Sequence, residues 1–363
     1  MPPTPADRDN HFSPEISKLL EMAIKRNASD LHLTVSVKPT LRIDGRLIPI
    51  EDETVLTGQS CQQLIAEFIS EEQKTRLQAK KEIDFSFQYG DQVRFRVNVF
   101  YQKGYIAAAL RLLPTQIRTI KELGLPPILE KFALASQGFV IVTGPTGHGK
   151  STTLAAIIDH INKTRAEHVI TVEDPIEYVF KNERSIVQQR EVFNDTNTFA
   201  RALRSVLRED PNVVLIGEMR DLESIEAALT IAETGHLVFT TLHTNTAAQT
   251  ADRVVDVFPP HQQQQVRSQL ANVLLGVISE RLIPKIGGGR VAAVEIMLAN
   301  SAVRTVIREG KTHQLPNIIQ TSVSEGMINL DKVLADFVSR GEIKLDDALT
   351  WAQDPKALKM NVY

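Results

Sequence analysis

Cysteine and long apolar runs are scarce in this sequence. Its one cysteine, Cys61, excludes an internal disulfide and a zinc module built from CxxC motifs. No apolar run reaches the roughly 18 to 20 residues that a membrane-spanning helix needs, so we expect no integral membrane segment. The first fourteen residues contain four prolines and no apolar core, so we expect no secretory signal there.

The sequence also lacks a charge imbalance. Its 41 Lys and Arg residues nearly offset its 44 Asp and Glu residues, for a net charge of −3. This balance supplies no overall attraction to nucleic acid, and we expect no nucleic-acid partner. With 42% hydrophobic and 23% charged residues, the composition is typical of a soluble globular protein, and we expect a cytoplasmic location. A length of 363 residues predicts two domains.

The first part of the chain predicts a small α+β domain after a short lead. We expect residues 1–12 to be disordered. Ser13 and Pro14 predict a capped helix start, and apolar residues at helical spacing continue the helix over 16–25. Alternating apolar residues predict strands near 31–35, 41–43, 47–48, 83–87 and 93–99, with a hairpin turn at Asp44-Gly45. The α+β domain is expected over residues 13–114.

Residues 115–363 predict a parallel sheet with helical crossovers. Four short runs are apolar at nearly every position, which is typical of strands buried on both faces: 139–143, 168–172, 213–216 and 237–241. Amphipathic segments between them predict the connecting helices. After the three glycines at 287–289 we expect mostly helical structure to the end. The predicted fold class of this region is therefore α/β.

The segment GPTGHGKS, 144–151, matches the phosphate-binding pattern G-x-x-x-x-G-K-[ST] between a predicted strand and a predicted helix. Its glycines let successive backbone N–H groups surround a phosphate, and the new helix presents its positive end to the same anion. Lys150 is expected to act on the β- and γ-phosphates of ATP, and Ser151 to ligate Mg²⁺. A chance glycine-rich turn is disfavoured by eight matched positions in this context. The predicted nucleotide ligands are Gly144, Pro145, Thr146, Gly147, His148, Gly149, Lys150, Ser151 and Thr152.

Two acids follow buried runs and are candidate catalytic residues. Glu218 closely follows the third run, and we expect it to act as general base or to position the attacking water. Glu173 follows the second run and is expected to reach the metal or its waters. The alternative there is a turn capped by Asp174. For Asp221 we favour a structural role as the N-cap of the next helix.

Two histidines and several arginines are further candidates. His236 and His243 flank the fourth run, where histidines either sense the γ-phosphate or are structural. We predict a catalytic role for His243 and nucleotide binding for His236. Arg204 and Arg208 share a predicted helix face at i, i+4. Such arginines are either solvated or act as an arginine finger across a subunit boundary, and Arg208 is the candidate nucleotide ligand.

Four blocks, in order, resemble the secretion ATPases of type II secretion and type IV pilus systems. They are GPTGHGKST (144–152), TVEDPIEY (171–178), REDPNVVLIGEMRD (208–221) and TGHLVFTTLHT (234–244). SDLHLT (29–34) and RFRVNVF (94–100) resemble the PAS-like N-terminal domain of the pilus retraction ATPases in this family. Residues 302–310, AVRTVIREG, resemble their C-terminal motif linked to retraction. His148 stands where serine is usual.

The resemblance implies a PAS-like domain followed by a RecA-like P-loop ATPase domain with a helical C-terminal part, assembled as a homohexamer. It implies that Arg94 and Arg96 contact the nucleotide or its pocket. It also implies pilus retraction at the inner face of the cytoplasmic membrane, with a platform protein and an accessory retraction ATPase as partners. Four alternatives stay open: that accessory ATPase, a pilus polymerisation motor, a nucleotide-gated scaffold with slow turnover, and a DNA translocase. The single cysteine disfavours the polymerisation motor, because those proteins usually carry a CxxC zinc module.

Overall fold

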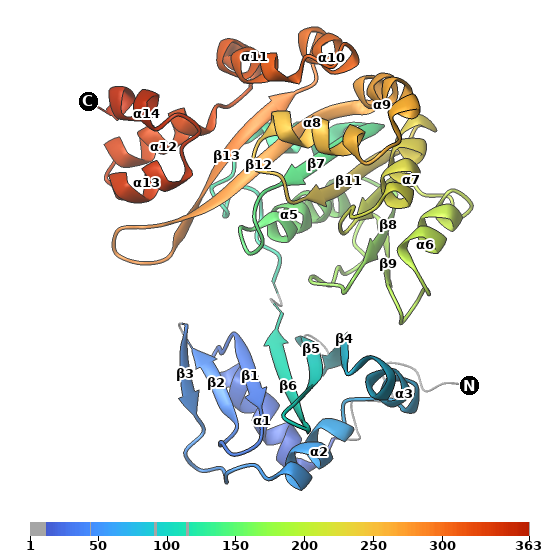
Figure 1. The fold of residues 1–363 in the computed structure, drawn as a ribbon, viewed down its shortest axis with the longest axis vertical. Helices are drawn as coiled ribbons and strands as arrows, with labels where there is room; N and C mark the ends of the chain where they lie inside the picture. Colours follow the sequence, from blue (N-terminus) through green and yellow to red (C-terminus); the bar gives the residue numbers. More distant parts are fainter. Residues whose placement is uncertain (1–11, 44, 91–92, 114–115, 363) are drawn as a thin grey trace. The chain divides into compact units, whose positions relative to one another are not determined.

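The computed structural model describes residues 12–43, 45–90, 93–113 and 116–362 (Figure 1). Most of the predicted lead, and Asp44 of the predicted hairpin turn, lie outside the described residues. The chain divides into two compact units. One contains the residues up to Gln116 together with Pro175–Val179, and the other contains Ile117–Asp174 and the chain from Phe180 onward. Within the described ranges, no helix has the length and apolar character needed to cross a membrane.

In its described residues, the first unit is a six-stranded antiparallel sheet with the order β3-β2-β1-β6-β5-β4. The predicted strands are present, whereas β6 was not predicted. The strands are β1 (Asp30–Leu33), β2 (Thr40–Ile43), β3 (Arg46–Pro49), β4 (Glu82–Tyr89), β5 (Val93–Gln102) and β6 (Tyr105–Leu112). The helices are α1 (Pro14–Lys25), α2 (Gly58–Ala66) and α3 (Glu71–Lys80).

Helix α1 begins where the sequence predicts. Ser13 Oγ accepts a hydrogen bond from the Ile16 N–H at 3.3 Å, and Pro14 occupies the first helical position. The cap satisfies one of the N–H groups that a helix start leaves without an internal partner. The apolar stripe of the helix is buried: Ile16, Leu19, Leu20 and Ala23. Local capping and periodicity therefore agree at this end of the chain.

The second unit contains a seven-stranded mixed sheet with the order β13-β12-β7-β11-β10-β8-β9 in the part of the chain that is described. The strands from β12 to β9 are parallel, and β13 pairs with β12 in the antiparallel sense. All four predicted strands are present, which confirms the α/β class. The strands are β7 (Gly138–Thr143), β8 (His168–Glu173), β9 (Ile186–Glu191), β10 (Val213–Ile216), β11 (Leu237–Leu242), β12 (Leu274–Pro284) and β13 (Arg290–Leu298).

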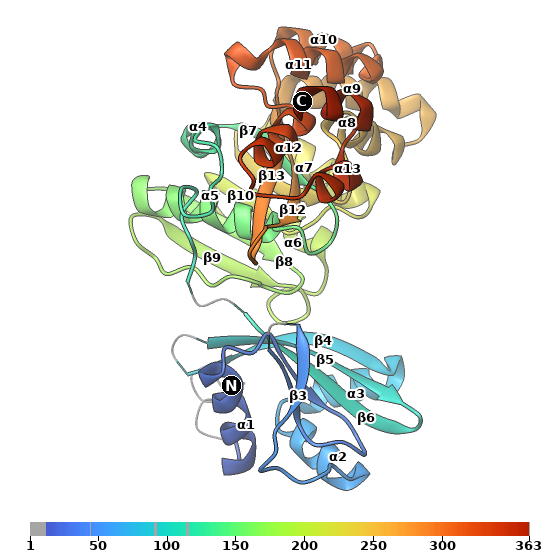
Figure 2. The ribbon, with the colours of Figure 1, turned by 90° about the vertical axis from the view of Figure 1, so that its left-hand side faces the viewer.

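Helices cover both faces of this sheet. Helices α4 (Ile128–Leu134) and α5 (Lys150–Thr164) lie on one side, and α7 to α9 lie on the other (Figure 2). A third group, α12 to α14, packs against β12 and β13, with Leu334 and Leu358 buried in a cluster with Ile283. The remaining helices are α6 (Phe199–Val206), α7 (Leu222–Glu233), α8 (Ala247–Asp256), α9 (Pro260–Val273), α10 (Ser301–Arg308), α11 (Leu315–Thr321), α12 (Leu330–Ser339), α13 (Leu345–Trp351) and α14 (Pro355–Val362), with 3₁₀ turns at Thr312–Gln314 and Val323–Glu325.

The prediction of mostly helical structure after the three glycines is wrong in its first part. These glycines lie in the turn of a long hairpin between β12 and β13, where the Lys285 N–H donates to the Gly289 carbonyl at 3.0 Å. The sequence conceals the hairpin because Glu280, Arg281 and Glu295 interrupt its apolar pattern, although all three side chains are buried. Helices follow only after β13.

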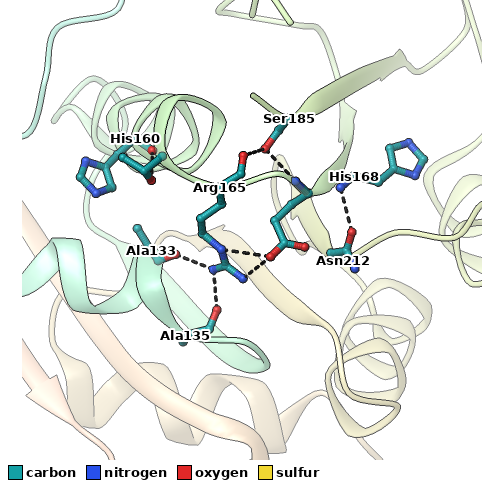
Figure 3. A network of polar contacts seen from close by, with 9 residues as sticks. Ala133, Ala135, His160, Arg165, His168, Ser185 and Asn212 are labelled. Carbon is teal, nitrogen blue, oxygen red and sulfur yellow. Dashed lines mark hydrogen bonds and ion pairs between the residues drawn. The ribbon is translucent and has the colours of Figure 1, made fainter. Parts of the chain in front are cut away.

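A polar network fixes the end of α5 at the amino ends of the central strands (Figure 3). The Arg165 guanidinium donates to the carbonyl oxygens of Ala133 and Ala135 at 2.6 and 2.7 Å, and to Glu167 Oε1 at 2.7 Å. Ser185 Oγ donates to the Arg165 carbonyl at 2.7 Å. Because charged hydrogen bonds are stronger than neutral ones, this network anchors α5 firmly to the sheet at the end opposite the P-loop.

Candidate nucleotide site

The loop between β7 and α5 has the backbone that phosphate binding requires. Gly144 and Gly149 have φ values of 146° and 95°, which side chains of other residues rarely allow. A Cβ atom on Gly144 would lie 2.4 Å from the Glu280 carbonyl oxygen, and one on Gly149 would lie 2.5 Å from Glu280 Oε1. Strand β12 therefore passes directly against the P-loop, and both positions require glycine.

The other predicted nucleotide ligands lie around this loop. Lys150, Ser151 and Thr152 form the first turn of α5, and the positive end of a helix favours an anion. His148 turns toward β12, where its Nδ1 accepts a hydrogen bond from the Leu282 N–H at 3.0 Å. The turn of the loop contains Pro145, Thr146 and Gly147, of which the last two are exposed.

A line of contacts joins the P-loop to the predicted catalytic acid. Lys150 Nζ lies 2.8 Å from the Gly144 carbonyl, 3.0 Å from the Pro145 carbonyl and 3.4 Å from His243 Nδ1. His243 Nε2 lies 3.3 Å from Glu218 Oε2. Because an ammonium group only donates, Nδ1 must accept, and the imidazole then donates its Nε2–H to the carboxylate. The structure thus brings Lys150, His243 and Glu218 together.

Glu218 is held in place by its neighbours on two strands. Arg220, which the prediction omitted, forms an ion pair with Glu218 Oε1. Thr241 Oγ1 donates to the Gly217 carbonyl at 2.6 Å, and the Met219 N–H donates to the Thr241 carbonyl at 3.2 Å. These bonds tie the end of β10 to β11, the strand that pairs with β7. The sequence offered a signal for Arg220, because a basic residue two positions after the candidate acid can form an ion pair with it.

Asp221 has the structural role that we favoured. Its Oδ1 accepts hydrogen bonds from the Ser224 N–H at 2.8 Å and from Ser224 Oγ at 2.7 Å, at the start of α7. An N-cap of this kind stabilises a helix by about 1 kcal/mol. The Asp221 carboxylate therefore stabilises the start of α7.

Glu173 lies at the end of β8, beside β10, which Glu218 follows by two residues. It is buried, and its Oε1 accepts hydrogen bonds from Thr171 Oγ1 at 2.6 Å and from Gln189 Nε2 at 3.2 Å. Two strands separate β8 from β7, which places Glu173 roughly 14 Å across the sheet from the P-loop strand. Mg²⁺ prefers oxygen ligands and commonly takes one or two side chains together with substrate phosphates. The Ser151 hydroxyl is such an oxygen, whereas Glu173, across the sheet, could act on the cation only through its waters.

The structure does not bring His236 to the phosphate site of its own chain. His236 precedes β11 at the amino end of the sheet, where its carbonyl accepts from the Gly138 N–H at 3.0 Å. Its Nδ1 lies 3.0 Å from Thr234 Oγ1 and 3.0 Å from the Ile231 carbonyl, at the end of α7. A six-residue strand spans roughly 20 Å, so His236 and His243 lie at opposite edges. His236 therefore has a structural role with respect to a nucleotide bound at the P-loop of its own chain, which is the second of the two alternatives given for it.

The predicted arginines lie on different elements, two of them in the first unit and Arg208 in the second. Helix α6 ends at Val206, so Arg208 lies beyond it, and the prediction that Arg204 and Arg208 share a helix face is wrong. In the first unit, Arg94 Nε donates to Ser86 Oγ at 3.0 Å. Arg96 lies on the same strand, β5, and forms an ion pair with Glu177 at 3.7 Å. Nucleotide binding by Arg94, Arg96 and Arg208 stays a prediction.

Glu280 is a site residue that the sequence reasoning missed. It is 2% exposed, and its Oε2 accepts a hydrogen bond from Thr153 Oγ1 of α5 at 2.7 Å. Burial raises the pKa of its carboxyl group to about 7, against the opposing effects of the Thr153 hydrogen bond and the charge of Lys150. A buried acid within an apolar strand was the available signal, because such acids are rare without a specific contact.

The raised pKa of Glu280 predicts a pH-dependent loss of stability. Its folded value lies above the ordinary value of 4.5, so between 4.5 and about 7 the folded chain holds a proton that the unfolded chain has released. The stability due to this proton is present at low pH and falls as the pH rises through that window. We expect Glu280→Gln to remove this component, about 3 kcal/mol, from the pH dependence. Urea unfolding of both proteins at about pH 5 and pH 8 measures it, and equal pH dependences would contradict the prediction.

Comparisons with known proteins identify a family for this chain. A family model described as type II/IV secretion system protein matches residues 6–349. The chain is similar to the type IV pilus retraction ATPase PilT of Pseudomonas aeruginosa, with 47% identity over 94% of this chain and 99% of that protein. It is also similar to a twitching motility protein of Neisseria gonorrhoeae, with 44% identity over 88% of this chain and 86% of that one.

A solved structure leads to the same family. The crystal structure of the pilus retraction motor PilT with bound ADP matches with a TM-score of 0.88 and 49% identity, over 94% of this chain and 98% of that one. The family model, the relatives and this structure each span nearly the whole chain. The chain therefore belongs to the type II/IV secretion system protein family.

Proposed function

We propose that this chain is the ATP-hydrolysing subunit of a homohexameric motor that retracts type IV pili by depolymerisation, the movement that produces twitching motility. The observation that carries the proposal is the line of contacts from Lys150 through His243 to Glu218. The direction of force is supported by similarity to a pilus retraction ATPase and to a twitching motility protein. An accessory retraction ATPase is the second candidate within the same family.

In this mechanism the P-loop amides and Lys150 hold the β- and γ-phosphates of ATP. When ATP binds, the Lys150 ammonium gives up its hydrogen bonds to the Gly144 and Pro145 carbonyls and donates to phosphate oxygens instead. Glu218 accepts a proton from the water that attacks the γ-phosphate, and His243 orients its carboxylate through the Nε2–H. Ser151 would hold Mg²⁺, with Glu173 acting through its waters, and the cation would supply neutralisation of the phosphate charge.

The assembly and its location complete the proposal. We assign residues 13–114 to a PAS-like domain and residues 115–363 to a RecA-like ATPase domain with a helical C-terminal region. In the ring, Arg94, Arg96 and Arg208 complete the nucleotide site of a neighbouring copy. The motor works in the cytoplasm, at the inner face of the cytoplasmic membrane, against a platform protein and alongside an accessory retraction ATPase.

Size-resolved ATPase measurements test the proposal. Purified protein is separated by size-exclusion chromatography, and ATP turnover is measured in each fraction with and without Mg²⁺. We expect turnover to follow a six-subunit species. Turnover confined to monomer fractions would contradict the ring, and turnover stimulated by DNA would favour a translocase.

The C-terminal motif allows retraction to be tested separately from hydrolysis. Arg304 supports the fold, because its guanidinium donates to the carbonyl oxygens of Ala271, Asn272, Leu274 and Ala299. Arg308 is exposed, and its guanidinium makes a long hydrogen bond, 3.4 Å, to Asn272 Oδ1. Arg304→Ala would leave these carbonyls without their donor and is expected to cost about 1–3 kcal/mol of stability.

Arg308→Ala is therefore the informative variant. We expect it to retain the wild-type ATPase rate and thermal stability and to abolish pilus retraction, measured as twitching of complemented cells. Arg304→Ala serves as the contrasting variant, with a lowered unfolding temperature. Wild-type twitching by Arg308→Ala cells would show that this arginine transmits no force.

A further inference from the structure

The last residue of α13, Trp351, lies against the P-loop. Its ring is 4.9 Å from the His148 ring, measured between centroids, with an interplanar angle of 67°. The Arg281 guanidinium lies over the same tryptophan, 5.6 Å from the ring centroid. Edge-on aromatic pairs and cation–π contacts of this kind each contribute a measurable attraction. The Trp351 side chain thus joins the C-terminal helices to the phosphate-binding loop.

Both partners of Trp351 are bonded to elements that frame the phosphate site. His148 is part of the loop and is fixed to β12 through the Leu282 N–H at 3.0 Å. Arg281 Nη2 donates to the Asn245 carbonyl at 2.6 Å, two residues after His243. Trp351 therefore lies where the P-loop, β12 and the end of β11 meet.

The chain after Trp351 is held firmly, so this contact has a rigid base. Asp331 of α12 accepts hydrogen bonds from the Gln353 and Asp354 N–H groups at 2.7 and 2.8 Å. The Gln353 side chain donates to Glu295 Oε2 at 2.5 Å, and Glu295 Oε1 accepts from the Ala247 N–H at 2.9 Å, at the start of α8. Because these hydrogen bonds hold the segment after Trp351 to α12, we expect a displacement of the P-loop to move helices α12 to α14 together.

We propose that Trp351 is a positioning residue for the P-loop, acting through His148, and that nucleotide binding is transmitted by this contact to helices α12 to α14. The inference rests on the proposed function, because it requires the P-loop to bind ATP. His148 makes the contact possible, since a smaller polar residue such as serine would have no ring to present to Trp351. Trp351 need not touch the nucleotide.

The tryptophan itself reports on the contact, because it is the only one in the sequence. Emission is recorded during Mg²⁺-ATP titration, while calorimetry records binding independently. We expect wild-type emission to change along the calorimetric binding curve, and His148→Ser to lose most of that change. Calorimetric binding with constant emission would overturn the inference and leave the proposed function standing. Absence of calorimetric binding by the wild type would overturn both.

A double-mutant cycle tests whether Trp351 acts through His148. Trp351→Ala and His148→Ser are each expected to weaken ATP binding roughly tenfold, and the double variant to be no weaker than either. Trp351→Phe is expected to restore most of the affinity, because it keeps an aromatic ring. Additive effects of the two substitutions would overturn the inference and indicate direct contact of Trp351 with the nucleotide.

Leu349→Ala is the matched control, because Leu349 packs in the same helical cluster. We expect it to lower the unfolding temperature by about as much as Trp351→Ala while leaving ATP affinity unchanged. Equal losses of affinity in both variants would reduce the role of Trp351 to general support of α13 and overturn the inference.

Discussion

Replacement of Glu218 with glutamine is expected to lower kcat about 10²- to 10⁴-fold and to leave ATP affinity unchanged. The amide cannot accept the proton of the attacking water. Its oxygen can still accept the His243 Nε2–H that Glu218 accepts at 3.3 Å, so the geometry of the site is retained. The P-loop and Lys150, which hold the phosphates, are untouched. Steady-state turnover and calorimetric binding measure the two quantities separately.

A neighbouring carboxylate provides the control for this variant. Glu223 lies in the first turn of α7, where it is exposed and pairs loosely with Arg204 at 3.8 Å. Glu223→Gln removes the same charge without touching the site and should keep the wild-type kcat. If Glu218→Gln turned over as fast as the wild type, Glu218 would not be the base. A wild-type rate as slow as that of the variant would favour the nucleotide-gated scaffold.

Lys150→Ala is expected to weaken ATP binding about 10²- to 10³-fold and to abolish measurable hydrolysis. Lys150 is only 7% exposed, so its charge acts in surroundings that screen it weakly. Charge-assisted hydrogen bonds contribute about 1.5–3 kcal/mol each, and the ammonium can make two to the phosphates. Calorimetry with Mg²⁺-ATP measures the loss of affinity.

Lysine removal also affects the loop itself, so two further variants separate charge from packing. Lys150→Met retains the apolar stem and loses the ammonium, and it should lose as much affinity as Lys150→Ala. Lys163→Ala removes a lysine from the same helix, where it pairs with Asp159 at 2.7 Å, and should bind ATP normally. Normal ATP affinity in Lys150→Met would mean that the charge does not hold the phosphates.

The parts of the site that could be predicted are those determined by local sequence. The P-loop follows from glycine positions between a strand and a helix, and the Asp221 cap follows from an acid before an amphipathic run. Glu218 and His243 could be placed together because the carboxyl ends of parallel strands share one edge of the sheet. The same rule, applied strictly, places His236 at the other edge.

The parts that could not be predicted depend on contacts between distant segments. Glu280 and Arg281 lie more than a hundred residues after the P-loop. Because both side chains are charged, the sequence of β12 resembles that of an exposed segment, although both are buried. Trp351 reaches His148 only because α12 to α14 pack against the β12–β13 hairpin. Nothing in the residues near Trp351 indicates its partner, because the contact exists only once the sheet has formed.

The close approach of β12 to the P-loop also limits how these proteins can diverge. No methyl group fits between Gly144 and the Glu280 backbone, or between Gly149 and the Glu280 carboxyl group. The side chain at residue 280 must therefore leave room for the backbone of Gly149. The loop and the strand must change as a pair, and a chimera that exchanged the nucleotide-binding loop between relatives would have to import β12 with it.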